Sequence, residues 1–284
     1  MKLKAKAIGA ILLLSILVVS AVPAIGINSV KADYGSATFC PNNSVEGLDT
    51  DNELYVSTVI TSEIAYYIYS YYGSYYNYFF YGTEQSPIYP SDYSWALNTL
   101  QDNCDKITFF SKGHCTPWGY ASQHYQLLCT LSDENNDHQA KDAIHIFPYT
   151  DEFECRLTFL WHCATARSYP IPPPYYDPDG PYGMPFCFTH NVGMTKYGTS
   201  GWAVFLGWNW QSPQFESEIP YQYPDYNWTF GHFAYFYYQL MAYGYSVNGA
   251  LEELSWFFYN TDFQNCPLYN SLIVWGNGNM NLGY

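Results

Sequence analysis

Two short apolar segments decide the fold of this chain, and each ends in a residue that can take part in acyl-transfer chemistry. Residues 107–114 read Ile-Thr-Phe-Phe-Ser-Lys-Gly-His, and residues 157–163 read Leu-Thr-Phe-Leu-Trp-His-Cys. Short runs rich in β-branched and aromatic residues are typical of buried strands. The sequence therefore predicts two strands that carry His114 and Cys163 at their tips.

The chemistry of these two side chains makes their pairing important. A thiol is a poor nucleophile until a neighbouring base favours its thiolate, so Cys163 beside His114 would be the minimum equipment for covalent acyl transfer. Two other interpretations stay open from the residues alone. Cys163 could be a disulfide partner. The pairs His114-Cys115 and His162-Cys163 could instead bind zinc, although adjacent strand residues point to opposite faces.

The N-terminal segment has the pattern of a secretory signal peptide. Three lysines in the first six residues precede an uncharged apolar run over residues 7–19, and small residues follow it. We expect residues 1–32 to be removed, and residues 33–284 to be secreted and to fold as a single domain. An uncleaved anchor would need the apolar run to continue through Ile25. After cleavage we expect no membrane partner.

The charge balance excludes polyanionic partners. The whole chain has a formal charge of −15, and the expected mature chain keeps six basic residues against 25 acidic ones, a charge of −19. Such a surface would repel nucleic acid and anionic lipid. Charged residues make up only 12% of the chain while tyrosine occupies 32 positions, so the polar surface is expected to be tyrosine-rich.

Eight cysteines in a chain expected to be secreted predict disulfides. They are residues 40, 104, 115, 129, 155, 163, 187 and 266. Cys104 and Cys155 precede the two strand-end residues by similar distances, so parallel neighbouring strands would bring them together, and we predict a disulfide between them. Sequons at Asn42 and Asn227 predict surface loops, which would carry glycans if glycosylation occurs.

The rest of the chain shows the alternation of helices and strands that is typical of α/β folds. Helices are expected over residues 54–72, 91–102 and 230–243, with another that begins after Ser246. Further strands are expected over residues 124–130, 143–148, 202–207 and 271–275; residues 75–81 are ambiguous between strand and helix, and residues 37–40 are only a weak first strand. In the first helix, one buried face is expected from Val56, Ile60, Ile64 and Ile68, which are spaced four apart.

Four blocks of the sequence, taken in order, suggest a family. Residues 103–114 form a strand that ends in Gly-His, residues 159–163 end in the candidate nucleophile, residues 201–207 form a following strand, and residues 244–251 begin a later helix. These blocks resemble the caspase-like cysteine peptidases, and the gingipain and clostripain branch more than the caspases proper. The gap of 49 residues from the histidine to the cysteine matches the His-before-Cys order of caspases.

The resemblance implies a fold and a set of roles. The fold would be a caspase-like three-layer sandwich with a mostly parallel sheet between helices, and its site would lie at the carboxyl ends of the strands. Cys163 would be the nucleophile and His114 the acid/base. The oxyanion would be held by the backbone N–H groups of Cys163 and Cys115. The chain departs from the family pattern at Cys115, because the residue after the histidine is usually glycine.

These observations together predict a secreted cysteine endopeptidase whose substrate is a peptide or a protein. No cofactor is required, although calcium could bind the acidic turns at residues 49–53 and 177–180. The acidity of these turns could instead contribute to a pocket for a basic substrate side chain. The alternative is a non-catalytic extracellular binding protein on the same scaffold, since fold does not fix function.

Overall fold

The structure is a computed structural model, and it describes the chain from residue 32 to residue 283 with gaps. The described residues are 32–41, 49–73, 75–83, 86, 88–117, 125–130, 139–141, 146–150, 154–166, 183–191, 193–222 and 227–283. They all belong to one compact unit. Within these residues, no helix combines the length and the apolar character needed to cross a bilayer. The expected signal peptide lies outside the described residues except for Ala32.

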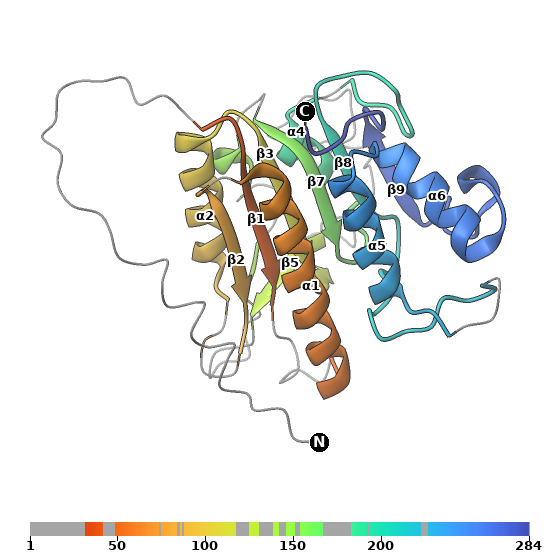
Figure 1. Ribbon diagram of the computed structural model, residues 1–284. Coiled ribbons are helices and arrows are strands. Elements are labelled where there is room, and N and C mark those ends of the chain that lie inside the picture. The colour runs from red at the N-terminus through yellow and green to blue at the C-terminus, as the bar shows by residue number, and fades with distance from the viewer. Residues whose placement is uncertain are drawn as a thin grey trace, which may run out of the picture. The chain divides into compact units, whose positions relative to one another are not determined.

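A six-stranded sheet is the centre of this unit, with its strands in the order β2-β1-β3-β7-β8-β9 (Figure 1). The strands are β1 (Gly35–Cys40), β2 (Asn77–Tyr81), β3 (Ile107–Lys112), β7 (Cys155–Trp161), β8 (Val204–Trp208) and β9 (Leu272–Gly276). Neighbouring strands run parallel except β8 and β9. The four central strands and β9 are almost wholly buried, as expected of strands covered on both faces.

The first strand corrects the sequence expectation. β1 lies inside the sheet between β2 and β3, rather than being a weak or missing element. Its signal in the sequence is weak because it begins with small residues. Gly35 is one of them, and a Cβ there would lie 2.5 Å from the Cys104 sulfur. Close packing of α2 on this strand therefore requires the absence of a side chain at this position.

A second, three-stranded antiparallel sheet follows β3 along the chain. It consists of β4 (Cys115–Pro117), β5 (Tyr125–Thr130) and β6 (Gln139–Lys141). The excursion predicted between the two main strands is therefore present, but its last strand is misplaced in the prediction. The expected strand at residues 143–148 is wrong, because the described part of this segment is the short 3₁₀ helix η1 (Phe147–Tyr149).

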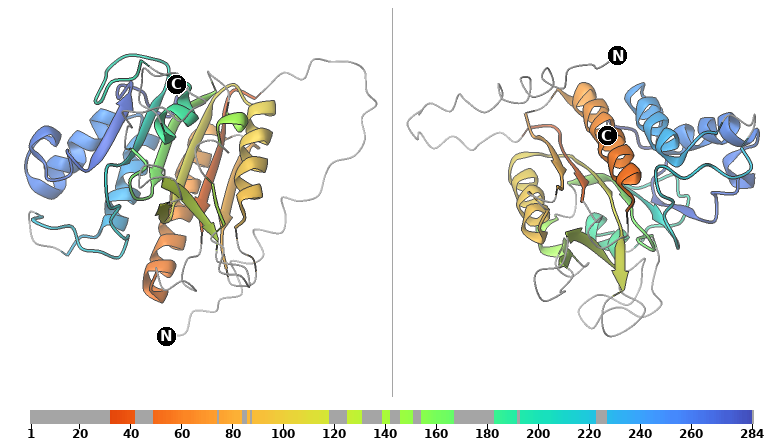
Figure 2. Two further views of the ribbon diagram at one scale, coloured as in Figure 1. Left: turned by 180° about the vertical axis from the view of Figure 1, so that it is seen from behind. Right: turned by 90° about the horizontal axis from the view of Figure 1, so that it is seen from below.

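Helices cover both faces of the main sheet, as the two further views show (Figure 2). One face packs against α1 (Asp51–Tyr72), α5 (Phe230–Ala242) and α6 (Val247–Tyr259), and the other against α2 (Pro90–Asn103) and α4 (Met184–Thr189). A second 3₁₀ helix, η2 (Phe263–Asn265), follows α6. The molecule is thus an α/β three-layer sandwich, as the sequence predicted.

Local signals in the sequence account for the ends of the helices. Thr50 caps α1 by accepting a hydrogen bond from the Glu53 N–H, and Gly73 ends it in the left-handed region at φ 60°. Ser246 caps α6 as predicted. The start of α2 differs from the prediction, because the N-cap is Tyr89, whose backbone N–H is bonded by the Asp92 carboxylate.

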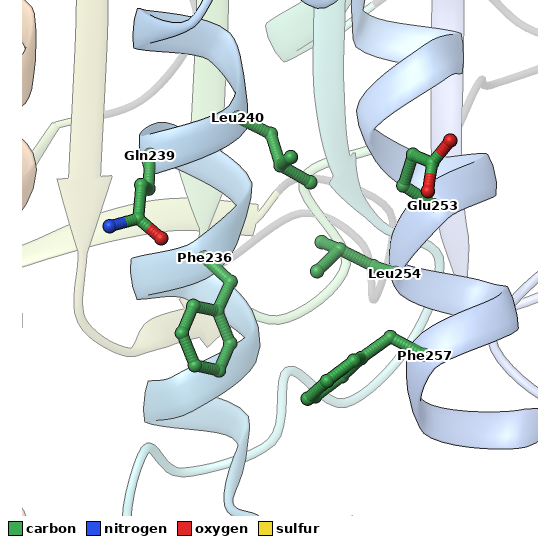
Figure 3. Close-up of a pocket in the computed structure, with 6 residues that line it drawn as sticks. All are labelled: Phe236, Gln239, Leu240, Glu253, Leu254 and Phe257. Atoms are coloured by element: carbon green, nitrogen blue, oxygen red, sulfur yellow. The ribbon is translucent and has the colours of Figure 1, made fainter.

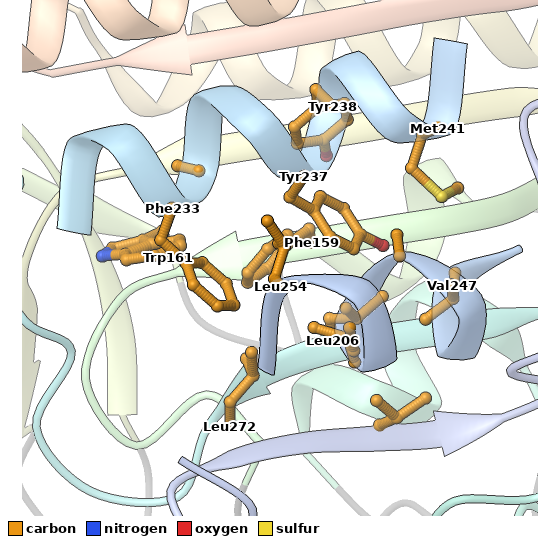
Figure 4. Packing of buried hydrophobic residues seen from close by; sticks show 14 of the residues in the cluster. Phe159, Trp161, Leu206, Phe233, Tyr237, Tyr238, Met241, Val247, Leu254 and Leu272 are labelled. Atoms are coloured by element: carbon orange, nitrogen blue, oxygen red, sulfur yellow. The ribbon is translucent and has the colours of Figure 1, made fainter. Parts of the chain in front are cut away.

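Aromatic side chains build the larger core cluster, on the face that α5 and α6 cover (Figure 4). Tyr237 of α5 makes an edge-to-face contact with Phe159 of β7, and Phe233 packs against Trp161. Such pairs stabilise a core beyond the burial of their area. Within the described residues, Tyr93, Tyr237, Tyr238 and Tyr259 are buried, whereas many other tyrosines are exposed.

The buried face of α1 differs from the one expected. Of the four apolar residues predicted to form it, only Ile64 and Ile68 are buried. The buried positions nearer the amino end belong to Glu53, Ser57 and Thr61. Spacing alone did not reveal this, because burial of the Glu53 carboxylate requires a partner from another element.

That partner is a lysine at the end of β3. The Glu53 carboxylate is fully buried and lies 2.9 Å from the Lys112 Nζ, which is itself only 4% exposed. The same carboxylate accepts hydrogen bonds from the backbone N–H groups of Phe215 and Glu216 and from the Ser57 hydroxyl. Both charges are thus paired and hydrogen-bonded, which is the condition under which buried ions are tolerated.

Removing one partner should be costly. We expect Glu53→Gln to lower the free energy of unfolding by about 3–5 kcal/mol, because it leaves the Lys112 charge buried without its counter-ion. Urea denaturation followed by circular dichroism measures this change. Asp51→Asn, an exposed change in the same helical turn, is the matched control and should cost at most about 1 kcal/mol.

A double variant separates loss of charge pairing from loss of shape. Combining Glu53→Gln with Lys112→Met removes both charges, so it should recover part of the stability that the single variant loses. Equal losses in Glu53→Gln and Asp51→Asn would show that the buried pair does not stabilise the fold.

Candidate functional site

The two predicted strand-end residues follow strands that are neighbours in the sheet. β3 and β7 are parallel neighbours, and their register pairs Lys112 with Trp161. The ladder continues past the strands, because the Gly113 N–H donates to the Trp161 carbonyl. His114 and Cys163 each come two residues after the last paired residue of their strand, so both lie at this end of the β3–β7 pair. The candidate site is therefore at the carboxyl ends of the strands, where α/β sheets bind ligands.

His114 has a carboxylate partner that the sequence did not assign to it. Its Nε2 lies 2.8 Å from Oδ1 of Asp49, and the two side chains are 19% and 5% exposed. Asp49 lies just before α1, in the acidic turn that we considered for calcium. A carboxylate in this position holds an imidazole in one orientation and one tautomer, leaving the other ring nitrogen for chemistry.

Cys163 is half-buried, and its sulfur contacts the segment that follows β8. The Ser212 N–H donates to the sulfur at 3.3 Å, and the Ser212 hydroxyl lies 3.5 Å from it. The same segment is fixed by hydrogen bonds from the Trp161 indole to the Pro213 carbonyl and from the Ala164 N–H to the Trp210 carbonyl. The thiol therefore lies against a segment tied to its own strand.

The Glu53 carboxylate ties this segment to α1 as well, since it binds the N–H groups of Phe215 and Glu216. The amino end of α1 thus contacts both halves of the candidate site. Asp49 holds the His114 ring, and Glu53 holds the chain that passes the Cys163 sulfur.

His162 is fully buried, and both of its ring nitrogens contact protein groups. Its Nδ1 lies 2.6 Å from the His114 carbonyl oxygen and its Nε2 lies 2.7 Å from the Ser111 hydroxyl. Burial lowers the pKa of this imidazole from 6.5 to about 3; the carbonyl hydrogen bond opposes that shift, and the nearby Lys112 charge adds to it. Because both ring nitrogens are engaged, the two-histidine, two-cysteine zinc site is not formed.

The acidic turn at residues 49–53 is engaged in protein contacts. Asp49 and Glu53 pair with His114 and Lys112 respectively, so their carboxylates do not converge on a common point. In the described part of the chain, no group of three histidine, cysteine or acidic side chains is arranged to hold a metal ion. The second turn considered for calcium, residues 177–180, lies outside the described residues.

Three cysteines singled out in the sequence, Cys115, Cys104 and Cys155, lie in different elements of the fold. Cys115 begins β4 opposite Leu127, and its backbone alone is described. Cys104 and Cys155 are both fully buried in the cluster beneath α2. Cys104 is the C-cap of α2, whereas Cys155 is in β7 opposite Ile107. The six cysteines with described side chains form no disulfide with one another in this structure. The disulfide between Cys104 and Cys155 stays a prediction.

Of the two predicted glycosylation sites, one can be placed. Asn227 is exposed, with a left-handed backbone at φ 56°, just before α5. Thr229 of the same sequon is the N-cap of α5. Asn42 lies outside the described residues.

One surface groove lies away from the ends of β3 and β7. A groove of about 210 Å³ between α5 and α6 is lined mostly by apolar side chains (Figure 3). They are Phe236, Gln239, Leu240, Glu253, Leu254 and Phe257. The groove contains neither of the strand-end residues, so the candidate site remains at the ends of β3 and β7.

Comparison with known proteins gives no family for this chain. A scan against models of known protein families finds none that matches this chain, and a search of curated proteins finds no match either.

The buried histidine makes stability depend on pH. In the unfolded chain its imidazole takes up a proton near pH 6.5, but in the folded protein only near pH 3. The unfolded state therefore binds more protons between these values, and the free energy of unfolding falls as the pH decreases through this window, by up to about 1.4 kcal/mol per pH unit.

We expect His162→Leu to remove this contribution. Urea midpoints measured at intervals from pH 7 to pH 4 should fall less steeply in the variant than in the native protein. His232→Gln, which changes an exposed histidine on α5, should leave most of the slope in place. An unchanged slope in His162→Leu would show that another group causes the acid sensitivity.

Proposed function

We propose that this protein is a secreted cysteine endopeptidase of the caspase-like type. The observation that carries the proposal is the pairing of His114 with Asp49 at the end of β3, beside the end of β7 that carries Cys163. His114 and Cys163 each come two residues after the last β3–β7 pair, and Asp49 binds the Nε2 of that histidine at 2.8 Å. A nucleophile, a base and a carboxylate that orients the base form the constellation used for covalent acyl transfer.

The strand order also favours this proposal. Parallel strands ending together bring chemically active residues to one edge of the sheet, and β1, β3 and β7 are consecutive in space. Asp49 comes from the connection between β1 and α1, so all three residues come from segments at the same edge. The resemblance of the sequence blocks to the gingipain and clostripain branch agrees with this arrangement.

The chemistry follows from the positions of these groups. His114 takes the thiol proton of Cys163, and the sulfur attacks the peptide carbonyl, forming an S–C bond while the carbonyl π electrons move to oxygen. The oxyanion is held by the backbone N–H groups of Cys163 and Cys115. The C–N bond then breaks as His114 returns the proton to the leaving amine. Water, activated by the same histidine, hydrolyses the thioester and regenerates the thiol.

A peptide library tests the proposal directly. The mature protein, residues 33–284, is incubated under reducing conditions with a mixed peptide library, with and without calcium, beside Cys163→Ala, and the products are identified by mass spectrometry. We expect cleavage by the native protein alone, with a consistent residue before the cleaved bond. No cleavage, in a folded protein whose Cys163 does not react with iodoacetamide, would favour the binding-protein alternative.

The role of Asp49 generates a second test. We expect Asp49→Asn to lower kcat/KM about 10²-fold or more, because an amide can hold the wrong imidazole tautomer. The matched control is Asp51→Asn, an exposed change two residues away, which should leave kcat/KM within about twofold, as expected of a surface site. Equal activity in the two variants would remove Asp49 from the site.

A further inference from the structure

A buried histidine holds the peptide group that follows His114. The His162 Nδ1 lies 2.6 Å from the His114 carbonyl oxygen. The ring reaches this position because residue 113 is glycine: a Cβ there would lie 2.7 Å from the His162 Cε1. His162 has no exposed surface, so water does not compete for this hydrogen bond.

The hydrogen bonds around the ring fix its tautomer. A carbonyl can only accept, so the Nδ1 of His162 carries the proton. The ring is neutral because burial lowers its pKa to about 3, and its Nε2 therefore accepts from the Ser111 hydroxyl at 2.7 Å. That hydroxyl in turn accepts from the Tyr93 hydroxyl at 2.9 Å. Every group in this chain has a partner, so the ring has one favoured orientation.

Holding this carbonyl also sets the direction of the next N–H group. The peptide unit is planar and trans, so the His114 C=O and the Cys115 N–H point in opposite directions. A fixed carbonyl therefore fixes the N–H that the proposed mechanism uses as an oxyanion donor. Glycine, usual at this position in the resembled family, provides no such restraint by itself.

The β4–β5 ladder leaves that N–H available. Pairs in an antiparallel ladder alternate between hydrogen-bonded and non-hydrogen-bonded. Pro117 pairs with Tyr125 and has no N–H, so this pair is of the second kind. The pair of Cys115 with Leu127, two positions along, is then of the second kind too. The Cys115 N–H is thus directed away from β5.

Adjacent residues at a strand end project to opposite faces, so the His162 ring and the Cys163 thiol lie on opposite sides of the chain. With its carbonyl turned to the His162 side, the 114–115 peptide turns its N–H to the thiol side. We propose that His162 is a positioning residue that aims the Cys115 N–H at the oxyanion formed on Cys163. This role rests on the proposed peptidase function.

The test compares two substitutions of the histidine that separate hydrogen bonding from packing. His162→Asn keeps an amide N–H near the position of Nδ1 but leaves space, whereas His162→Leu fills the space and has no donor. We expect kcat of His162→Leu to fall about 10- to 100-fold with KM little changed, somewhat less than the loss of a whole oxyanion donor. His162→Asn should keep kcat within about fivefold of the native value.

A peptide aldehyde carrying the preferred cleavage sequence supplies an independent readout. Its carbonyl carbon bonds to the Cys163 sulfur and its oxygen becomes the alkoxide or hydroxyl of a hemithioacetal, which occupies the oxyanion site. The inhibition constant should rise in His162→Leu by a factor similar to the loss in kcat, and should rise much less in His162→Asn. Thermal melting confirms that each variant is folded.

Gly113→Ala is the second variant should His162→Leu fail to fold. Its Cβ displaces the ring without removing it, and we expect the same loss of kcat. The inference is wrong if the Leu and Asn variants lose kcat equally, or if His162→Leu raises KM instead of lowering kcat. In either case His162 only fills space. If the native protein cleaves nothing and Cys163 does not react with iodoacetamide, the peptidase function fails, and the positioning role with it.

Discussion

The buried ion pair between Glu53 and Lys112 is the constraint on which the rest of this structure depends. Two ions taken out of water are stable only when each is paired and the remaining hydrogen-bonding capacity is used. Lys112 ends β3, and Glu53 meets it from the first turn of α1 while binding two backbone N–H groups beyond β8. One carboxylate thus connects three segments that are far apart in the sequence.

This connection explains why the candidate site has its particular geometry. With the first turn of α1 held against β3, Asp49 lies beside His114 at 2.8 Å. With the segment after β8 held against α1, Ser212 contacts the Cys163 sulfur. Fixed groups around a reacting centre need no reorganisation during the reaction. The ion pair therefore supports the candidate site without being part of the proposed Cys163–His114 pair.

The sequence predicts the parts of this molecule that depend on local signals. The two strand-end runs, the Gly73 stop of α1 and the Ser246 cap of α6 have short-range causes, and all are present. The parallel pairing of β3 with β7 follows the rule that α/β connections favour parallel neighbours.

The sequence could not predict the features that depend on contacts between residues far apart in the chain. A small-residue strand such as β1 is recognisable only from its place in the sheet, because burial on both faces removes the alternation that marks a strand. The roles of Asp49 and Glu53 were not predictable for a different reason, because an acidic turn before a helix is usually solvated. Glu53, Ser57 and Thr61 also recur four apart in α1, and this spacing was the available sequence signal for a buried polar stripe.

In the proposed peptidase, His114 after β3 is the base that activates the Cys163 thiol after β7. The most direct measurement is the rate at which iodoacetamide alkylates Cys163 at pH 6, followed by mass spectrometry of the peptide that contains it. We predict labelling at least about tenfold faster in the native protein than in His114→Asn, because the thiolate is the reacting species and the imidazole promotes it. Equal rates in the two proteins would show that His114 does not activate the Cys163 thiol.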